Sequence, residues 1–176
     1  MPNQNTMFIR TKRVKEHDYA YLVKNKWTKN GPRQKTIKYL GPVFCAPYLK
    51  EISMEKFLEP TKIEHLFIET PIAGIYKILI ERELIRHGFI KKDENVYIYE
   101  DIIVNLNARS VRKGRRNIAM KMNEGFLCHV TMNNIFEHTQ QEDETGKKLA
   151  EDILGAGIAI EKDMFVRIFN YLKAPE

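Results

Sequence analysis

Alternating apolar and polar positions in the first third of the chain predict three short β-strands between residues 8 and 40. These strands are rich in β-branched and aromatic residues, and their sequences are FIRTKRV, YAYLVKNKW and RQKTIKYL. Gly31-Pro32 marks the turn before the third strand. Gly41-Pro42 is expected to close the meander, because proline cannot donate to a continuing ladder. The pattern therefore predicts a three-stranded antiparallel meander.

Period-two alternation gives the two faces of this meander different chemistry. The aromatic and apolar side chains of the second and third strands are expected on one face: Tyr19, Tyr21, Val23, Trp27, Ile37 and Tyr39. The other face is expected to be largely basic and to carry Leu22, Lys24, Lys26, Gln34, Thr36 and Lys38.

Residues 42–70 contain three prolines and only a short amphipathic piece around SMEKFLE, so they are interpreted as a connecting region without core elements. We therefore expect an α+β protein in three parts. A small basic three-stranded module spans residues 1–45, a connector spans residues 46–70, and a mixed module of helices and a β-hairpin spans residues 71–176.

The strongest helical pattern begins at Thr70-Pro71, which offers an N-cap followed by an N1 proline. Its apolar positions recur at helical spacing as far as His87, and Gly88 is expected to end the helix. The sequence predicts this helix to be central to the later module.

Beyond that helix, alternation over residues 104–109 and 118–123 predicts a β-hairpin whose basic tip is VRKGRR. Three short helices are expected around residues 131–138, 145–154 and 161–173. The polar run QQEDETGKK between the first two helices is expected to be a solvated loop.

Positive charge is concentrated at the start of the chain. Residues 1–60 hold 12 Lys and Arg against 5 Asp and Glu, a net charge of +7, whereas residues 61–176 hold 17 against 18, a net charge of −1. Such asymmetry creates a local positive potential that attracts polyanions, and phosphate backbones are the commonest partner.

Two basic segments, the meander and the hairpin tip, are predicted to contact nucleic acid. The candidate binding residues are Arg10, Lys12, Arg13, Lys15, Tyr21, Lys24, Lys26, Trp27, Lys29, Arg33, Lys35, Lys38, Arg112, Lys113, Arg115 and Arg116. The rings among them suit stacking on unpaired bases. In the alternative interpretation, the rings form the core of the small module, its lysines keep an edge strand soluble, and the tip is an ordinary exposed turn.

Residues that often carry chemistry form no convincing catalytic or metal site in the sequence. Cys45 and Cys128 lack zinc-finger spacing. The five histidines are taken to lack the carboxylate at i, i+4 that a metal-binding helix needs. The candidate magnesium carboxylates are Glu100-Asp101 and the run Glu142, Asp143 and Glu144, for which solvated charge is the preferred interpretation. No cofactor is expected.

The N-terminus shows no signal-peptide core, and no uncharged apolar run reaches the ~18 residues of a membrane span. Two scattered cysteines suit a reducing compartment. The sequence therefore predicts a cytoplasmic protein without a membrane partner.

The N-terminal segment resembles the basic meander that begins certain insertion-sequence transposases. The matching positions are Met7-Phe8-Ile9-Arg10, Tyr21-Leu22-Val23, Arg33-Gln34 and Leu40-Gly41. The ribonuclease-H-like catalytic core of that family has no counterpart here, so the resemblance implies a nucleic-acid-binding module without transposition. The whole chain also resembles a family of archaeal proteins that share the meander and bring no known activity.

These features favour a non-enzymatic protein that binds DNA, or an RNA or the ribosome, through the phosphate backbone. A protein-interaction adaptor, whose near-neutral later module docks a partner, is the first alternative. A metal-dependent nuclease is the weaker alternative.

Overall fold

The computed structural model describes residues 7–29, 31–138 and 146–174, and these residues form an α+β fold with two sheets. The strands are β1 Met7–Val14, β2 His17–Thr28, β3 Gly31–Cys45, β4 Ile90–Asp93, β5 Val96–Tyr99, β6 Ile102–Asn105, β7 Ser110–Lys113, β8 Arg116–Asn117, β9 Ala119–Met122 and β10 Gly125–Leu127. The helices are α1 Met54–Phe57, α2 Pro60–Glu69, α3 Ile72–Arg86, α4 His129–Phe136, α5 Gly146–Gly155 and α6 Lys162–Lys173. Residues 139–145, which include most of the predicted polar loop, lie outside the described residues.

The predicted meander is present, but it belongs to a larger sheet. β1, β2 and β3 are antiparallel neighbours, and the sheet continues through β9 and β10 in the order β1-β2-β3-β9-β10. The meander closes at Gly41-Pro42 as predicted, since the pairing of β3 with β2 ends at Pro42, but the strand itself runs on to Cys45 and pairs in parallel with β9 from Val43. The change of partner falls at Pro42, which has no N–H to offer a ladder.

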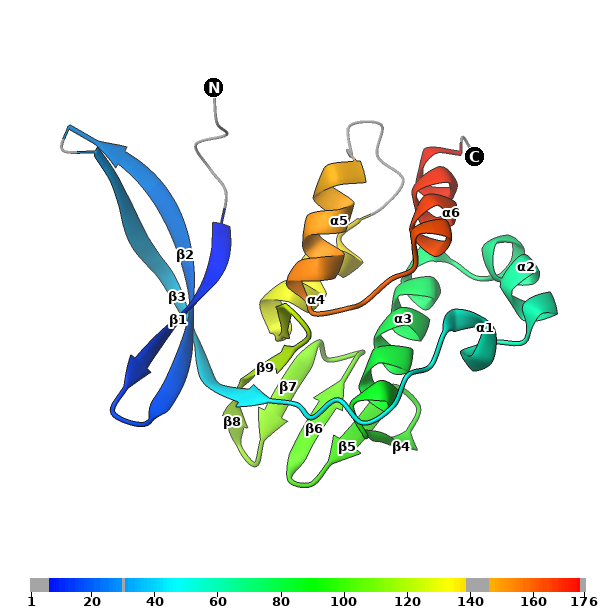
Figure 1. The fold of residues 1–176 in the computed structure, drawn as a ribbon, viewed down its shortest axis with the longest axis horizontal. Helices are drawn as coiled ribbons and strands as arrows, with labels where there is room; N and C mark the ends of the chain where they lie inside the picture. The colour runs from blue at the N-terminus through cyan, green and yellow to red at the C-terminus, as the bar shows by residue number, and fades with distance from the viewer. Residues whose placement is uncertain (1–6, 30, 139–145, 175–176) are drawn as a thin grey trace.

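β1, β2 and β3 as far as Pro42, called here the arm, stand to one side of the remaining elements, called the body (Figure 1). Gly41 sits where the arm reaches the body and has a φ of +117°, a conformation that side chains rarely tolerate. A Cβ at this position would overlap the carbonyl oxygen of Asn117. Only glycine therefore allows β3 to approach the end of β8 this closely.

The second sheet is a meander of five antiparallel strands in sequence order, β4 to β8. The predicted basic hairpin has its tip as expected, because Lys113 pairs with Arg116 around a two-residue turn. Its strands differ from the prediction. The chain turns back between β6 and β7, with Arg109 at a φ of 48°, and Ala119–Met122 joins the other sheet as β9. Alternation in the sequence continues across this turn and therefore did not reveal it.

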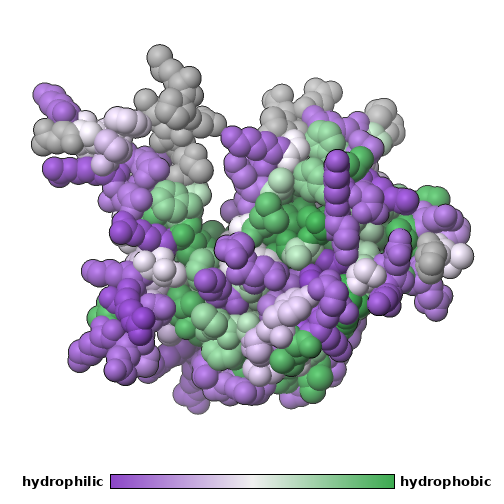
Figure 2. Space-filling view, in the orientation of Figure 1, coloured by the Kyte–Doolittle hydropathy of each residue, from purple (hydrophilic) through white to green (hydrophobic). Residues whose placement is uncertain are grey.

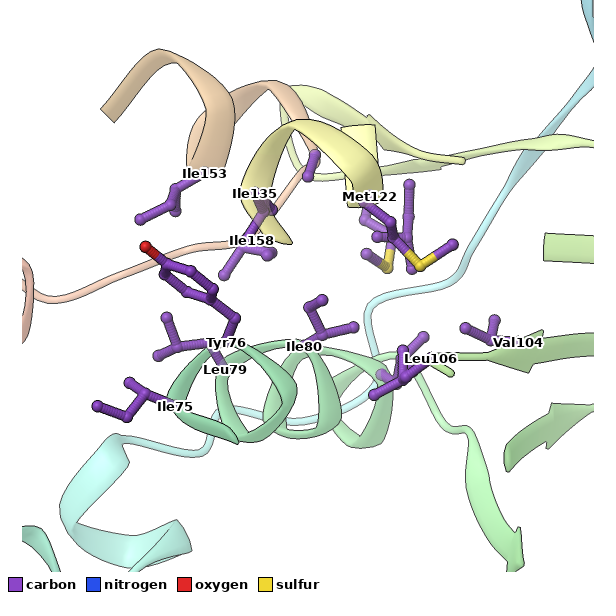
Figure 3. Packing of buried hydrophobic residues seen from close by; sticks show 14 of the residues in the cluster. Ile75, Tyr76, Leu79, Ile80, Val104, Leu106, Met122, Ile135, Ile153 and Ile158 are labelled. Carbon is purple, nitrogen blue, oxygen red and sulfur yellow. The ribbon is translucent and has the colours of Figure 1, made fainter. Parts of the chain in front are cut away.

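The main core lies between α3 and the helices and strands that cover it. Tyr76 and Ile80 project from α3 towards Ile135, Ile153 and Ile158, which come from α4, α5 and the segment after α5 (Figure 3). All five side chains are at most 1% exposed. Burial of each aliphatic side chain contributes about 1.5–3 kcal/mol to folding. The prediction of a central helix ending at Gly88 is thus confirmed, although Pro71 rather than Thr70 occupies the N-cap.

The interpretation of residues 42–70 as a connecting region without core elements is wrong. α1 and α2 lie in this region, and Met54, Ile63 and Leu66 are buried in the same cluster as α3. α1 falls within the amphipathic piece SMEKFLE, whereas α2 was not expected. In the described part of the chain, no helix combines the length and the apolar character needed to cross a membrane.

We expect Gly41→Ala to destabilise the protein by at least about 2 kcal/mol more than Gly31→Ala. Both glycines have positive φ, but a Cβ at Gly31 would meet nothing within 4 Å. The two variants therefore share the backbone strain and differ in the clash with Asn117. Urea unfolding measures the difference, and equal free energies of unfolding would contradict the close approach at Gly41.

Candidate nucleic-acid interface

The outer half of the β2–β3 ribbon carries cations in opposed pairs. Lys24 pairs with Lys35, and Lys26 pairs with Arg33, across the two antiparallel strands. Directly opposed residues point to the same face with Cβ atoms about 5 Å apart. These four side chains therefore share one surface, called here the ribbon patch.

The ribbon patch has no neutralising partner among the described residues. None of its four cations forms an ion pair with a described carboxylate. Like charges directly opposed on neighbouring strands destabilise a sheet. A polyanion bound to this face would remove that repulsion. Hydrophilic side chains cover much of the outer arm, while apolar side chains gather nearer the body (Figure 2).

Register shifts in β3 correct the predicted faces. Tyr21 is opposite Tyr39, as simple alternation requires. Val23, however, is opposite Thr36, because β3 is irregular between these pairs. Thr36 and, two residues earlier, Gln34 therefore lie on the aromatic face with Tyr39 and not on the basic face as predicted. Alternation in one strand cannot reveal a bulge, which depends on the partner strand.

The basic residues of the arm are not all on one surface. Arg10 and Lys12 pair with Tyr21 and Tyr19, so both lie on the aromatic face, where Arg10 donates a hydrogen bond to Gln34. The other predicted cations of the arm occupy separate places: Arg13 opposite Asp18, Lys15 in the turn between β1 and β2, and Lys29 beyond the end of β2.

An exposed group of tyrosines occupies the aromatic face. The ring centre of Tyr39 lies 5.4 Å from that of Tyr21 and 6.3 Å from that of Tyr19, in tilted arrangements. Tyr39 is 52% exposed, and Trp27 on the same face is 57% exposed. These rings are therefore surface features, and the buried core near the arm is instead built around Ala20 and Leu40.

The tyrosine group borders a cavity of about 640 Å³ where the arm meets the hairpin tip, called here the junction cavity. Its lining residues are Tyr19, Lys38, Tyr39, Leu40, Gly41, Pro42, Arg116, Asn117 and His129. The cavity brings Lys38 of the arm together with Arg116 of the tip. The two predicted basic segments thus meet at these residues. Arg112 and Arg115 are exposed outside the cavity lining, and Lys113 pairs with Asp101 at 3.3 Å.

The charges around the junction cavity affect the groups that line it. Burial, together with Tyr19 and Tyr21, raises the pKa of Tyr39, and the positive charge of Arg116 partly opposes this rise. Burial lowers the pKa of His129, and Lys38 lowers it further. His129 was not among the predicted binding residues, because nothing near it in the sequence indicates that it meets the arm.

A separate groove of about 680 Å³ lies between the arm and the body. Phe8, Ile9 and Leu22 of the arm, with Phe126 and Val130 of the body, provide its apolar lining. Its charged lining residues are mainly acidic: Glu124, Glu137, Glu151 and Asp152, with Lys148. This wall repels phosphate, so the groove differs in chemistry from the junction cavity.

Nowhere in the described ranges do three His, Cys, Asp or Glu side chains lie together so that they could hold a metal ion. The prediction that the histidines lack a carboxylate at i, i+4 is wrong, since His65 pairs with Glu69 and His87 with Glu83. Glu100 occupies a tight turn between β5 and β6. The predicted cluster at residues 142–144 falls outside the described residues.

The most buried charges form a structural cluster on α3. Glu83 is fully buried and accepts hydrogen bonds from the Asn123 amide at 2.8 Å and the Ala159 backbone N–H at 3.2 Å. Arg86 pairs with Glu83 at 3.0 Å, and His87 lies 3.3 Å from it. Burial raises the pKa of Glu83, but the contacts with His87, Asn123 and Arg86 outweigh burial and lower the pKa overall.

The sequence matches no family model, and the chain matches neither a curated protein nor a solved structure. The resemblances of the meander and of the whole chain therefore stay predictions.

We expect Glu83→Gln to cost about 3 kcal/mol of stability, because it removes the buried carboxylate from Arg86 and leaves that guanidinium with the exposed carboxylate of Glu51. Glu81→Gln, which removes the ion pair with the half-exposed Lys91 and can keep a hydrogen bond with Tyr97, should cost less than about 1 kcal/mol. Because the folded-state pKa of Glu83 is lowered, its contribution is complete above the unfolded-state pKa of about 4.3 and is lost as pH falls through the folded-state pKa. Unfolding measured from pH 7 to pH 3 should show a smaller loss for Glu83→Gln than for wild type, and parallel curves would contradict this role.

Proposed function

We propose that the protein is a non-enzymatic nucleic-acid-binding protein that contacts the phosphate backbone through the ribbon patch. The observation that carries the proposal is the two pairs of opposed cations, Lys24 with Lys35 and Lys26 with Arg33, on a projecting ribbon without a described carboxylate partner. Repulsion between the opposed cations destabilises the free ribbon, and a bound polyanion would relieve this repulsion. The relief favours binding.

The shape of the arm supports the same proposal. A two-stranded ribbon is narrow enough to enter a nucleic-acid groove or to follow one strand of the backbone. Lys24 and Lys26 lie two residues apart on β2, so their Cα atoms are about 6.7 Å apart along the strand. The ribbon patch thus offers successive cations along one line, and the proposal covers DNA and RNA, including ribosomal RNA.

A cytoplasmic location is part of this proposal. Cys45 and Cys128 are both free cysteines, and Cys45 is exposed. Free exposed thiols persist in reducing compartments, where nucleic acid is also found.

A second candidate function, a protein adaptor, is supported by the groove between the arm and the body. Met7, Phe8 and Ile9 all line this groove although neighbouring strand residues point to opposite faces, so the free edge of β1 borders it. A free strand edge accepts an added strand. With Glu137 and Glu151 on the opposite wall, the occupant we propose is an extended peptide with alternating apolar and basic residues.

Replacing the ribbon patch should weaken binding to nucleic acid. We expect Lys24→Gln/Lys26→Gln/Arg33→Gln/Lys35→Gln to reduce affinity at least about tenfold. The slope of log affinity against log salt concentration should become less steep by about 0.9 for each lost phosphate contact on a duplex, or by about 0.7 on a single strand. Fluorescence anisotropy from 50 to 200 mM salt measures both effects.

The matched control is Lys50→Gln/Lys92→Gln/Lys162→Gln/Arg167→Gln, which removes the same charge from exposed residues of the body. Unchanged or higher thermal stability of the ribbon variant separates lost contacts from unfolding, because neutral side chains relieve the repulsion between the strands. Equal loss of affinity in both variants, or binding that is insensitive to salt, would refute the ribbon patch as the interface.

The adaptor candidate predicts that a labelled eight-residue Leu-Lys alternating peptide binds, whereas its Leu-Glu counterpart does not. Glu137→Lys/Glu151→Lys should abolish binding of the Leu-Lys peptide by reversing the charge of the wall. Titration followed by fluorescence anisotropy tests this, and binding that the double variant leaves intact would eliminate the groove as the site.

A further inference from the structure

We propose that the junction cavity binds an unpaired nucleotide, with the base against the ring of Tyr39 and the phosphate beside Lys38 and Arg116. The inference rests on the proposed function and adds to it a second contact site and a preference for unpaired strands. Its arm residues, Tyr19 and residues 38–42, are distinct from the four residues of the ribbon patch.

Tyr39 provides a suitable platform for a base. Its ring is 52% exposed, and contacts with Tyr19 and Tyr21 at tilted angles of 39° and 49° hold it in place from neighbouring β2. A ring that is already fixed loses little conformational entropy when a ligand stacks on it. Stacking of one base on an aromatic side chain is worth about 1–3 kcal/mol.

The charges of the cavity suit a phosphate. Lys38 and Arg116 both line it. Arg116 opposes the rise in the pKa of Tyr39, and Lys38 lowers the pKa of His129, so both charges are felt by other residues of the same lining. Its nine lining residues include no Asp or Glu. The groove on the other side of the arm has four acidic lining residues, so the two hollows select opposite charges.

The geometry discriminates between paired and unpaired strands. In a duplex, both faces of each base are covered by neighbouring base pairs, so a base must leave the stack before it contacts an aromatic ring. A platform set in a cavity is therefore reached by loops, ends and single strands.

The test compares wild type with Tyr39→Ala on labelled 12-nucleotide single-stranded DNA, the matching RNA and the matching DNA duplex, by fluorescence anisotropy. We expect Tyr39→Ala to weaken binding to one or both single strands about 5- to 150-fold and to leave duplex binding within about twofold. Tyr39→Phe, which keeps the ring, should bind like wild type. Ile37→Ala, which removes another exposed side chain of β3 outside the cavity, should also bind like wild type.

A second pair of variants tests the phosphate contact. Arg116→Gln should weaken single-strand binding, whereas Arg167→Gln, which removes an exposed arginine of α6 outside the cavity lining, should not. Circular dichroism of each variant checks that the fold is retained.

The outcomes separate this inference from the proposed function. If wild type binds none of the three oligonucleotides, both are overturned. If binding depends on the ribbon patch while Tyr39→Ala and Arg116→Gln match their controls, the junction cavity is overturned and the proposed function stands. An equal loss of duplex and single-strand binding in Tyr39→Ala overturns the preference for unpaired strands.

Discussion

The fold depends on the point at which β3 exchanges one partner for another. Up to Pro42 the strand is antiparallel to β2, and from Val43 it is parallel to β9. The exchange requires Gly41, because any side chain there would collide with the backbone of Asn117. This close approach fixes the arm against the body and places Tyr39, two residues earlier, beside Arg116 of the hairpin tip.

The arm and the body also differ in how their positive charges are balanced. Several cations of the body have carboxylate partners: Arg82 with Glu161, Arg86 with Glu83 and Glu51, Lys91 with Glu81, and Lys113 with Asp101. The cations of the ribbon patch have none among the described residues. The excess positive charge of the early sequence is therefore available to an external anion, while the charges of the body stabilise the fold.

The arm presents different chemistry on its two faces. Near the body, one face buries Ala20 and Leu40 against Cys128, and further out the same face carries the ribbon patch. The opposite face carries the tyrosines with Arg10 and Lys12. Irregular pairing within β3 maintains this arrangement, because it lets Tyr39 and Thr36 share a face although they are three residues apart.

The sequence by itself determined the features that depend on neighbouring residues. The three strands of the arm, the central helix that ends at Gly88 and the turn between Lys113 and Arg116 all follow from local alternation, periodicity and turn residues. The concentration of cations in the arm was also evident, since it needs only counting.

Only the tertiary structure decided which of these residues meet. The parallel pairing of β3 with β9, the irregular register that moved Thr36 to the aromatic face, and the approach of His129 to Lys38 join segments that are adjacent in space but distant or out of phase in sequence. Such contacts depend on the shape of a partner that no local pattern contains.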